Sequence, residues 1–123
     1  MGSLYQDGER CNPESDPRLL SAMLDSLKHS FMFADTDHVI RYMNPAATAN
    51  YKQGESLLGT NLLDCHNEQS GAMILEIFAE MQDGLDEKLI TDNEKHRIYM
   101  RAVRDEDGNV LGYYERYEPP KGS

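Results

Sequence analysis

Cys65 and His66 are adjacent in the sequence, and they carry two of the side chains that bind transition metals most readily. A thiolate and a neutral imidazole each donate an electron pair to a metal ion. Other interpretations remain open, because His66 can instead cap a helix or lie at the surface. Cys65 can be a redox-sensitive thiol or simply a small buried apolar side chain. We therefore take these two residues as the first candidates for a site.

A strand pattern further along the chain adds two candidate ligands. Because side chains alternate between the faces of a strand, His96, Ile98, Met100 and Ala102 share one face, and Arg97, Tyr99, Arg101 and Val103 share the other. The first face is the apolar one, so we expect it to face the helices, with Met100 across an interior pocket from His66. Met100 is then either a metal ligand or plain core, and His96 is an alternative ligand or a donor to one.

The signatures of several other chemistries are missing from the sequence. It has no Cys-x-x-Cys-His, no spaced Cys/His set for zinc and no glycine-rich phosphate loop. It also has neither a nucleophile elbow nor a kinase signature set. The Asp pairs at 35 and 37 and at 105 and 107 fall in predicted turns, where Asp hydrogen-bonds to the backbone. We therefore do not expect an enzyme.

The elements that position these residues begin with a helix at Asp16-Pro17, since Asp is a good N-cap and Pro suits the first helical position. This helix carries an apolar stripe made of Leu19, Leu20, Met23, Leu24 and Leu27. Such a stripe on a terminal helix either packs on the domain's own sheet or forms a dimer contact. The sequence leaves both alternatives open.

The rest of the chain predicts strands and helices in a recognisable order. Residues 31–43 form a β-hairpin with a polar turn at 36–38, and Asn44-Pro45 opens a short helix. Asn67 caps a longer helix that ends at Gly84. Three strands follow, from Glu87 to Thr91, from Lys95 to Arg104 and from Val110 to Glu118. The order predicts an α+β fold, in which a five-stranded antiparallel sheet has its helices packed on one face.

Length and charge limit the organisation and the partners. The 123 residues suffice for one domain, which we place at 17–118, between a flexible lead at 1–16 and a tail at 119–123. A net charge of -10 argues against nucleic acid and anionic membranes as direct partners. The chain has no apolar run that could span a bilayer and no signal-peptide pattern, and its two cysteines form no disulfide framework. These features favour a cytoplasmic location.

Residues 31–47 resemble the PAS (Per-Arnt-Sim) sensor family; their sequence is FMFADTDHVIRYMNPAA. In that family an apolar strand is followed by Asp, a turn, a second apolar strand, Asn and then small residues. Residues 104–114, RDEDGNVLGYY, are similar to the turn and last strand of that family. The resemblance covers 17–118 and implies a sensor domain that binds a small ligand in an interior pocket. His38 stands where many members carry Gly, so we expect a wider first turn here.

Residues 58–66, LGTNLLDCH, are similar to a subgroup with a Cys-His pair before the long helix, some members of which are thought to bind haem. Oxygen-sensing histidine kinases and carbon-monoxide-responsive transcription regulators of the family also hold iron through a histidine in this region. The resemblance implies haem b on His66, with Met100 as the ligand that a diatomic gas displaces, and with Cys65 and His96 as further candidates. Asn67 departs from the Pro often found in the subgroup.

Two rival functions remain beside haem-based sensing. One is a cofactor-free interaction module whose sheet face and first helix mediate dimerisation. The other is a pocket for a small organic ligand, with His66 or Arg97 as its polar anchor. We expect a homodimer, together with a fused or separate output domain such as a kinase or a transcription regulator.

Overall fold

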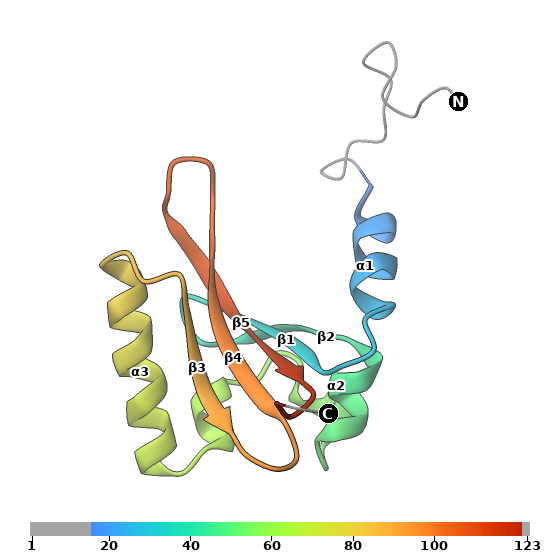
Figure 1. Ribbon diagram of the computed structural model, residues 1–123. Helices are drawn as coiled ribbons and strands as arrows, with labels where there is room; N and C mark the ends of the chain where they lie inside the picture. Colours follow the sequence, from blue (N-terminus) through green and yellow to red (C-terminus); the bar gives the residue numbers. More distant parts are fainter. Residues whose placement is uncertain (1–15, 122–123) are drawn as a thin grey trace.

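The computed structural model describes residues 16–121, whose five strands form one antiparallel sheet in the order β2-β1-β5-β4-β3 (Figure 1). The strands are β1 (Phe31–Asp35), β2 (Ile40–Met43), β3 (Glu87–Asp92), β4 (Arg97–Arg104) and β5 (Val110–Glu118). Between β2 and β3 come α2 (Pro45–Asn50), the 3-10 helices η3 (Gly54–Leu57) and η4 (Leu62–Cys65), and α3 (Glu68–Gln82). The predicted α+β fold is confirmed. The predicted flexible lead lies outside the described residues, except for Asp16.

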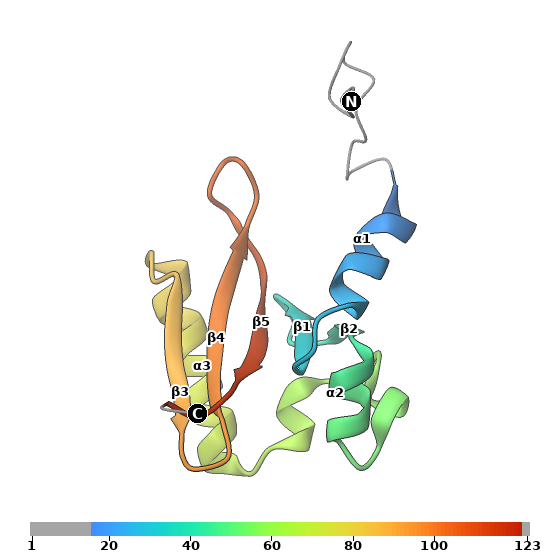
Figure 2. The same cartoon turned by 45° about the vertical axis from the view of Figure 1, so that its right-hand side comes forward.

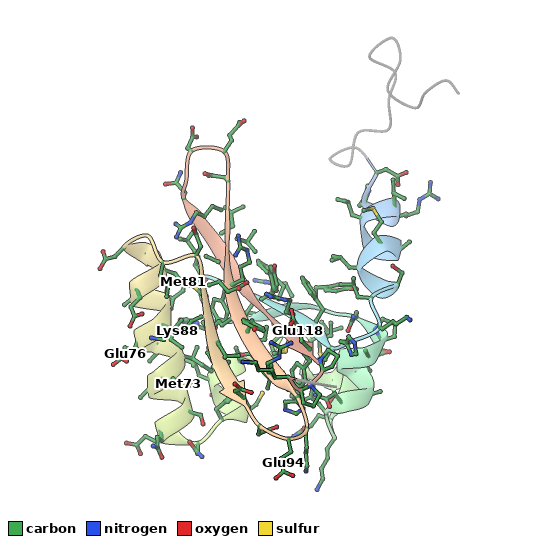
Figure 3. All side chains as sticks on the ribbon, viewed as in Figure 1. Met73, Glu76, Met81, Lys88, Glu94 and Glu118 are labelled. Carbon is green, nitrogen blue, oxygen red and sulfur yellow. The ribbon has the colours of Figure 1, made fainter. Side chains whose placement is uncertain are left out.

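One face of the sheet, which we call the inner face, packs against these helices. Figure 3 shows Met81 on the sheet side of α3 and Glu76 on the opposite side. Apolar side chains from alternate strand positions and from the helices form one buried cluster: Met32, Ala34, Ile40, Met43, Ala47, Leu57, Leu62, Ile74, Ile77, Met81, Met100 and Tyr113. The prediction that Met100 points toward the helices is confirmed, because β4 alternates as a half-buried strand should.

Local capping signals produce the predicted helix ends. The side chain of Asp16 accepts a hydrogen bond from the backbone of Leu19 at 3.2 Å, and that of Asn67 accepts one from Ser70 at 2.8 Å. Each bond adds an acceptor for a backbone N–H in the first turn, where the i−4 helical acceptor is missing. Gly84, with φ of 116°, follows α3 in the left-handed conformation that glycine adopts without strain.

The strand predicted from Lys95 starts two residues later, at Arg97. The side chain of Asn93 accepts hydrogen bonds from the backbone N–H groups of Lys95 (2.9 Å) and His96 (3.0 Å), which holds these residues in the turn between β3 and β4. The prediction that His96 is a strand residue on the inner face is therefore wrong. At the start of β4, hydrogen bonds from the backbone to the side chain of Asn93 have replaced the hydrogen bonds between strands.

The turn between β1 and β2 is not widened by His38. His38 itself adopts the left-handed conformation, with φ of 66°, and its N–H donates to the carbonyl of Asp35 at 2.9 Å. This conformation is uncommon for a residue with a Cβ. The ring of His38 packs 5.0 Å from that of Phe78 and 5.7 Å from that of Tyr113. We infer that these contacts offset the local strain, and the expected wider turn is wrong.

Helix α1 (Pro17–Asp25) has no buried residue and projects away from the sheet in Figures 1 and 2. The stripe residues Leu19, Leu20, Met23 and Leu27 are exposed, and Met23 most of all, at 56%. The alternative in which this stripe packs on the domain's own sheet is therefore wrong. Within residues 16–121, no helix is long and apolar enough to cross a membrane.

The side chain of Asn44 joins three segments at the end of β2 and is fully buried, at 0% exposure. Its carboxamide oxygen accepts hydrogen bonds from the N–H groups of Phe31 (3.1 Å) and Ala47 (2.8 Å). Its amide nitrogen donates to the carbonyl of His29 at 3.0 Å. One buried amide thus connects the segment after α1, the start of β1 and the first turn of α2.

Asn44→Ala should lower the free energy of unfolding by about 3 kcal/mol, because three backbone groups lose their hydrogen bonds to one fully buried amide. Asn67→Ala is the matched control. It removes one exposed cap bond and should cost about 1 kcal/mol. Urea unfolding followed by circular dichroism measures both values. Equal losses in the two variants would contradict the role of Asn44.

Candidate functional site

His66 lies between η4 and α3, and its imidazole is half-buried. Its Nδ1 is 2.9 Å from the carbonyl oxygen of Leu62. A carbonyl can only accept a hydrogen bond, so Nδ1 carries the proton and, in the neutral ring, Nε2 keeps a free electron pair. The turn of η4 sets this geometry, and the side chain of Asn61 caps that turn by accepting from the N–H of Leu63 at 2.8 Å. The local structure therefore prepares His66 as an electron-pair donor.

Met100 lies on the inner face of β4 and has no exposed surface. Its Cα is paired with that of Glu115 on β5, and it belongs to the same buried cluster as Ile74, Ile77 and Met81 of α3. His66 interacts electrostatically with Glu115, the strand neighbour of Met100, so both candidates lie toward the inner face.

His96 does not join them. It is half-buried in the turn between β3 and β4, and its ring lies 4.8 Å from that of Tyr117. It lines a surface hollow of about 440 Å³ together with Lys28, His29 and Lys95. Because neither His66 nor Met100 lines that hollow, His96 stands apart from the interior candidates.

Cys65 is a free cysteine with an exposed side chain, so its interpretation as a buried apolar residue is wrong. Partial burial of the thiol, with the carboxyl groups of Asp64 and Glu115 nearby, raises its pKa above the ordinary value. A thiol with a raised pKa is protonated at neutral pH and is a poor metal ligand and nucleophile. Across residues 16–121, no three His, Cys, Asp or Glu side chains gather as a metal-ion site.

Glu115 is the interior residue that the sequence reasoning missed. It is 5% exposed, and its carboxyl oxygen Oε2 has no hydrogen-bond partner in the part of the chain that the structure describes. On the neighbouring strands its Cα pairs with those of Met32 and Met100. Burial raises the pKa of the carboxyl group, and the nearby imidazole of His66 partly offsets that rise. Alternation along β5 could have found it, because Tyr113, Glu115 and Tyr117 occupy every second position.

Aromatic hydroxyl groups add to the polar character of the inner face. The hydroxyl of Tyr113 shares a hydrogen bond of 2.8 Å with Nδ1 of His38, and that of Tyr51 lies 3.4 Å from that of Tyr117. Burial, with the charge of Glu115 nearby, raises the pKa values of Tyr51 and Tyr113. Burial lowers the pKa of His38. These hydroxyl groups therefore stay protonated near neutral pH.

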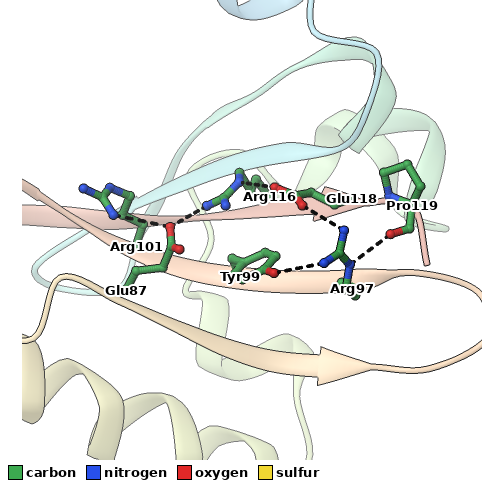
Figure 4. A network of polar contacts seen from close by, with 7 residues as sticks. All are labelled: Glu87, Arg97, Tyr99, Arg101, Arg116, Glu118 and Pro119. Carbon is green, nitrogen blue, oxygen red and sulfur yellow. Dashed lines mark hydrogen bonds and ion pairs between the residues drawn. The ribbon is translucent and has the colours of Figure 1, made fainter. Parts of the chain in front are cut away.

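The opposite, outer face of the sheet carries an ionic network, drawn in Figure 4. Glu87 accepts a charge-assisted hydrogen bond from Arg116 at 2.7 Å. Arg97 donates to Glu118 at 3.3 Å and to the carbonyl of Pro119 at 3.0 Å. Because Arg97 is held on this face, its predicted role as an anchor in the interior pocket is wrong.

A family model described as "PAS domain" matches residues 20–118. No curated protein matches the chain in a sequence comparison. Among solved structures, a C-terminal domain from Streptococcus mutans is similar, with a TM-score of 0.70 and 23% identity, over 86% of this chain and 86% of that one.

Two similar structures come from Vibrio cholerae. A sensory box sensor histidine kinase has a TM-score of 0.58 and 17% identity, over 85% of this chain and 92% of that one. The Aer2 receptor, described as a dual PAS-heme oxygen sensor, has a TM-score of 0.55 and 20% identity, over 77% of this chain and 96% of that one. At these identities the likeness establishes the fold and leaves the ligand open.

Cys65 should react slowly with iodoacetamide at neutral pH, because its pKa is raised from an ordinary value of 9.0. In a Cys11→Ser background, the alkylation rate should reach half its maximum at a higher pH than in an unfolded peptide of the same local sequence. Mass spectrometry at a series of pH values measures the rate. A midpoint below that of the peptide would show that Cys65 is an activated thiol.

Proposed function

Because this chain belongs to the PAS domain family, we propose that it is a sensory domain that binds a small ligand between η4, α3 and the inner face of the sheet. It passes the bound state to a partner or to an output domain and catalyses no reaction itself. The observation that carries this proposal is the imidazole of His66, whose Nδ1–H is held by the carbonyl of Leu62 so that Nε2 is free to bind.

Haem b is the ligand that we propose first, because the donor atoms of the chain fit it. An imidazole with its Nδ1–H bonded to a carbonyl is oriented and more basic, which suits an iron ligand. The buried thioether of Met100 would be a second donor that could bind the iron. The carboxyl oxygen Oε2 of Glu115 has no hydrogen-bond partner among residues 16–121, which supports a site in which a bound ligand supplies that partner. When bound, haem would supply an iron centre that takes up a diatomic gas.

Haemin titration followed by absorption spectroscopy tests this assignment. The wild type should bind one equivalent, and His66→Ala should abolish or strongly disturb the Soret band. Met100→Leu should retain haem and change mainly the ferrous spectrum, because a thioether prefers the softer ferrous iron. His96→Ala is the control and should leave the spectrum unchanged, since His96 lies in the turn between β3 and β4.

Met100→Leu keeps a similar side-chain volume, so its cost in unfolding free energy should stay below about 1.5 kcal/mol. A wild type that binds no haemin, or a His66→Ala variant with an unchanged spectrum, would rule out haem on His66.

A cofactor-free interaction module is the second candidate. The close packing of Met81, Met100 and Ile74 in the interior favours it, because each is at most 1% exposed. The outer face also offers aromatic contact area, where the rings of Phe31 and Tyr114 stack at 4.5 Å. Together with the exposed stripe of α1, this surface is of the kind that proteins cover by self-association.

If α1 mediates dimerisation, replacing Leu20 and Leu24 by Gln should lower the mass measured by analytical ultracentrifugation toward that of a monomer. The fold should persist, because α1 contributes no buried residue. Leu75→Gln is the matched control, an exposed leucine on α3 whose replacement should leave the mass unchanged. A wild type that remains monomeric at high concentration would refute this role.

A further inference from the structure

The carboxyl group of Glu115 is the most anomalous feature of the interior. It is 5% exposed, and no donor among residues 16–121 forms a hydrogen bond to its Oε2. Leaving a buried polar group without a partner costs roughly 1–3 kcal/mol, and more if the group is charged. Such groups are few in native proteins, and each one calls for an explanation such as stored strain, a functional role or a bound water or ion.

No basic side chain of the neighbouring strands compensates it. The side chains beside Glu115 across the inner face, Met32 and Met100, are apolar. Three arginines of β4 and β5 bind on the outer face instead, where Arg97 and Arg116 pair with Glu118 and Arg101 pairs with Glu87. The fourth, Arg104, donates to the carbonyls of Met81 and Leu85 at the end of α3. Within residues 16–121, no ion pair includes Glu115.

The surroundings of Glu115 also indicate which ligands would be rejected. A ligand that brought a carboxylate or phosphate to this depth would meet the carboxyl group of Glu115, which forms no ion pair within residues 16–121, and that approach is unfavourable in a low-dielectric interior. A positively charged centre, or an N–H group that carries positive charge, would instead give the oxygen the partner that it lacks. His66 lies close enough to interact electrostatically with this carboxyl group.

We propose that Glu115 is the residue that selects the ligand of this interior site, by pairing its free carboxyl oxygen with a positively charged group of the ligand. This inference rests on the proposed ligand site beside His66 and names the class of molecule that the site accepts. Two kinds of ligand carry such a positive charge. One is a porphyrin with a trivalent metal ion at its centre, and the other is a molecule with an organic ammonium group.

The first experiment measures thermal unfolding without ligand. Glu115→Met keeps the side-chain volume and removes the unpartnered oxygen, so the midpoint should rise by at least about 4 °C. Glu118→Met is the matched control on the same strand, where the carboxylate is paired with Arg97 and Arg116. Its midpoint should stay the same or fall. A lower midpoint for Glu115→Met would show that the carboxyl group is held internally, for example by a buried water, and would overturn the proposal.

The second experiment compares two redox-inert porphyrins of nearly equal shape, gallium(III) and zinc(II) protoporphyrin. The gallium core carries a positive charge, whereas the zinc core is neutral. Glu115→Gln keeps the shape of the side chain and removes its capacity for negative charge. It should weaken binding of the gallium porphyrin by about tenfold or more, and leave the affinity for the zinc porphyrin within about twofold. Fluorescence titration measures both affinities.

The third experiment probes organic cations by NMR of the methionine methyl groups. Ethylammonium should shift the signals of Met32 and Met100, which flank Glu115, while acetate should not. Met73 is exposed on α3 and serves as the internal control. Glu115→Gln should remove the ethylammonium shift.

The outcomes separate this inference from the proposed function. If neither porphyrin binds but ethylammonium shifts Met32 and Met100, haem is excluded and the selecting role of Glu115 is supported for an organic cation. If both porphyrins bind and Glu115→Gln changes neither affinity, the haem site is supported and the role of Glu115 is overturned. If wild-type protein binds none of the three probes, both ideas are refuted.

Discussion

The rest of the structure depends on the buried amide of Asn44. Its oxygen caps α2 and holds the first residue of β1, and its nitrogen binds the segment that follows α1. A side-chain amide has both donor and acceptor atoms, so a single residue can satisfy backbone groups from three directions. The consequence reaches the candidate site, because α2 leads through η3 into η4, and η4 sets the position of His66. A change at Asn44 therefore acts on the site through the path of the backbone.

The charged side chains on the two faces of the sheet differ in whether they have partners. On the outer face, carboxylates and guanidinium groups satisfy one another, as Glu87 does with Arg101 and Arg116. On the inner face, Glu115 is buried between Met32 and Met100 of the neighbouring strands and forms no ion pair within residues 16–121. A buried carboxyl group without a partner lowers the stability of the ligand-free domain. The same group can strengthen ligand binding, because the ligand supplies the partner. This trade-off is the physical basis for regarding the inner face, rather than the ionic network, as the site.

Several features could be read from short stretches of sequence, and others could not. The caps at Asp16 and Asn67 and the inward position of Met100 followed from local rules, and the structure confirmed them. The start of β4 was placed two residues early, because the side chain of Asn93 holds the turn. His38 kept a tight turn that glycine usually occupies, since packing with Phe78 and Tyr113, both distant in sequence, compensates its conformation.

By itself the sequence determined the order of helices and strands, the α+β class and which strand positions share the apolar face. These features depend on capping, turn residues and side-chain alternation within a few residues. It also singled out His66. Only the tertiary structure decided that Arg97 binds Glu118 and Pro119, that His96 stands apart, and that within residues 16–121 Glu115 is buried without a hydrogen-bond partner for Oε2. Burial and pairing depend on which strands become neighbours and on which side the helices pack. Those contacts join residues far apart in the chain. A local sequence pattern therefore cannot show whether a distant segment places a charged partner beside a buried group.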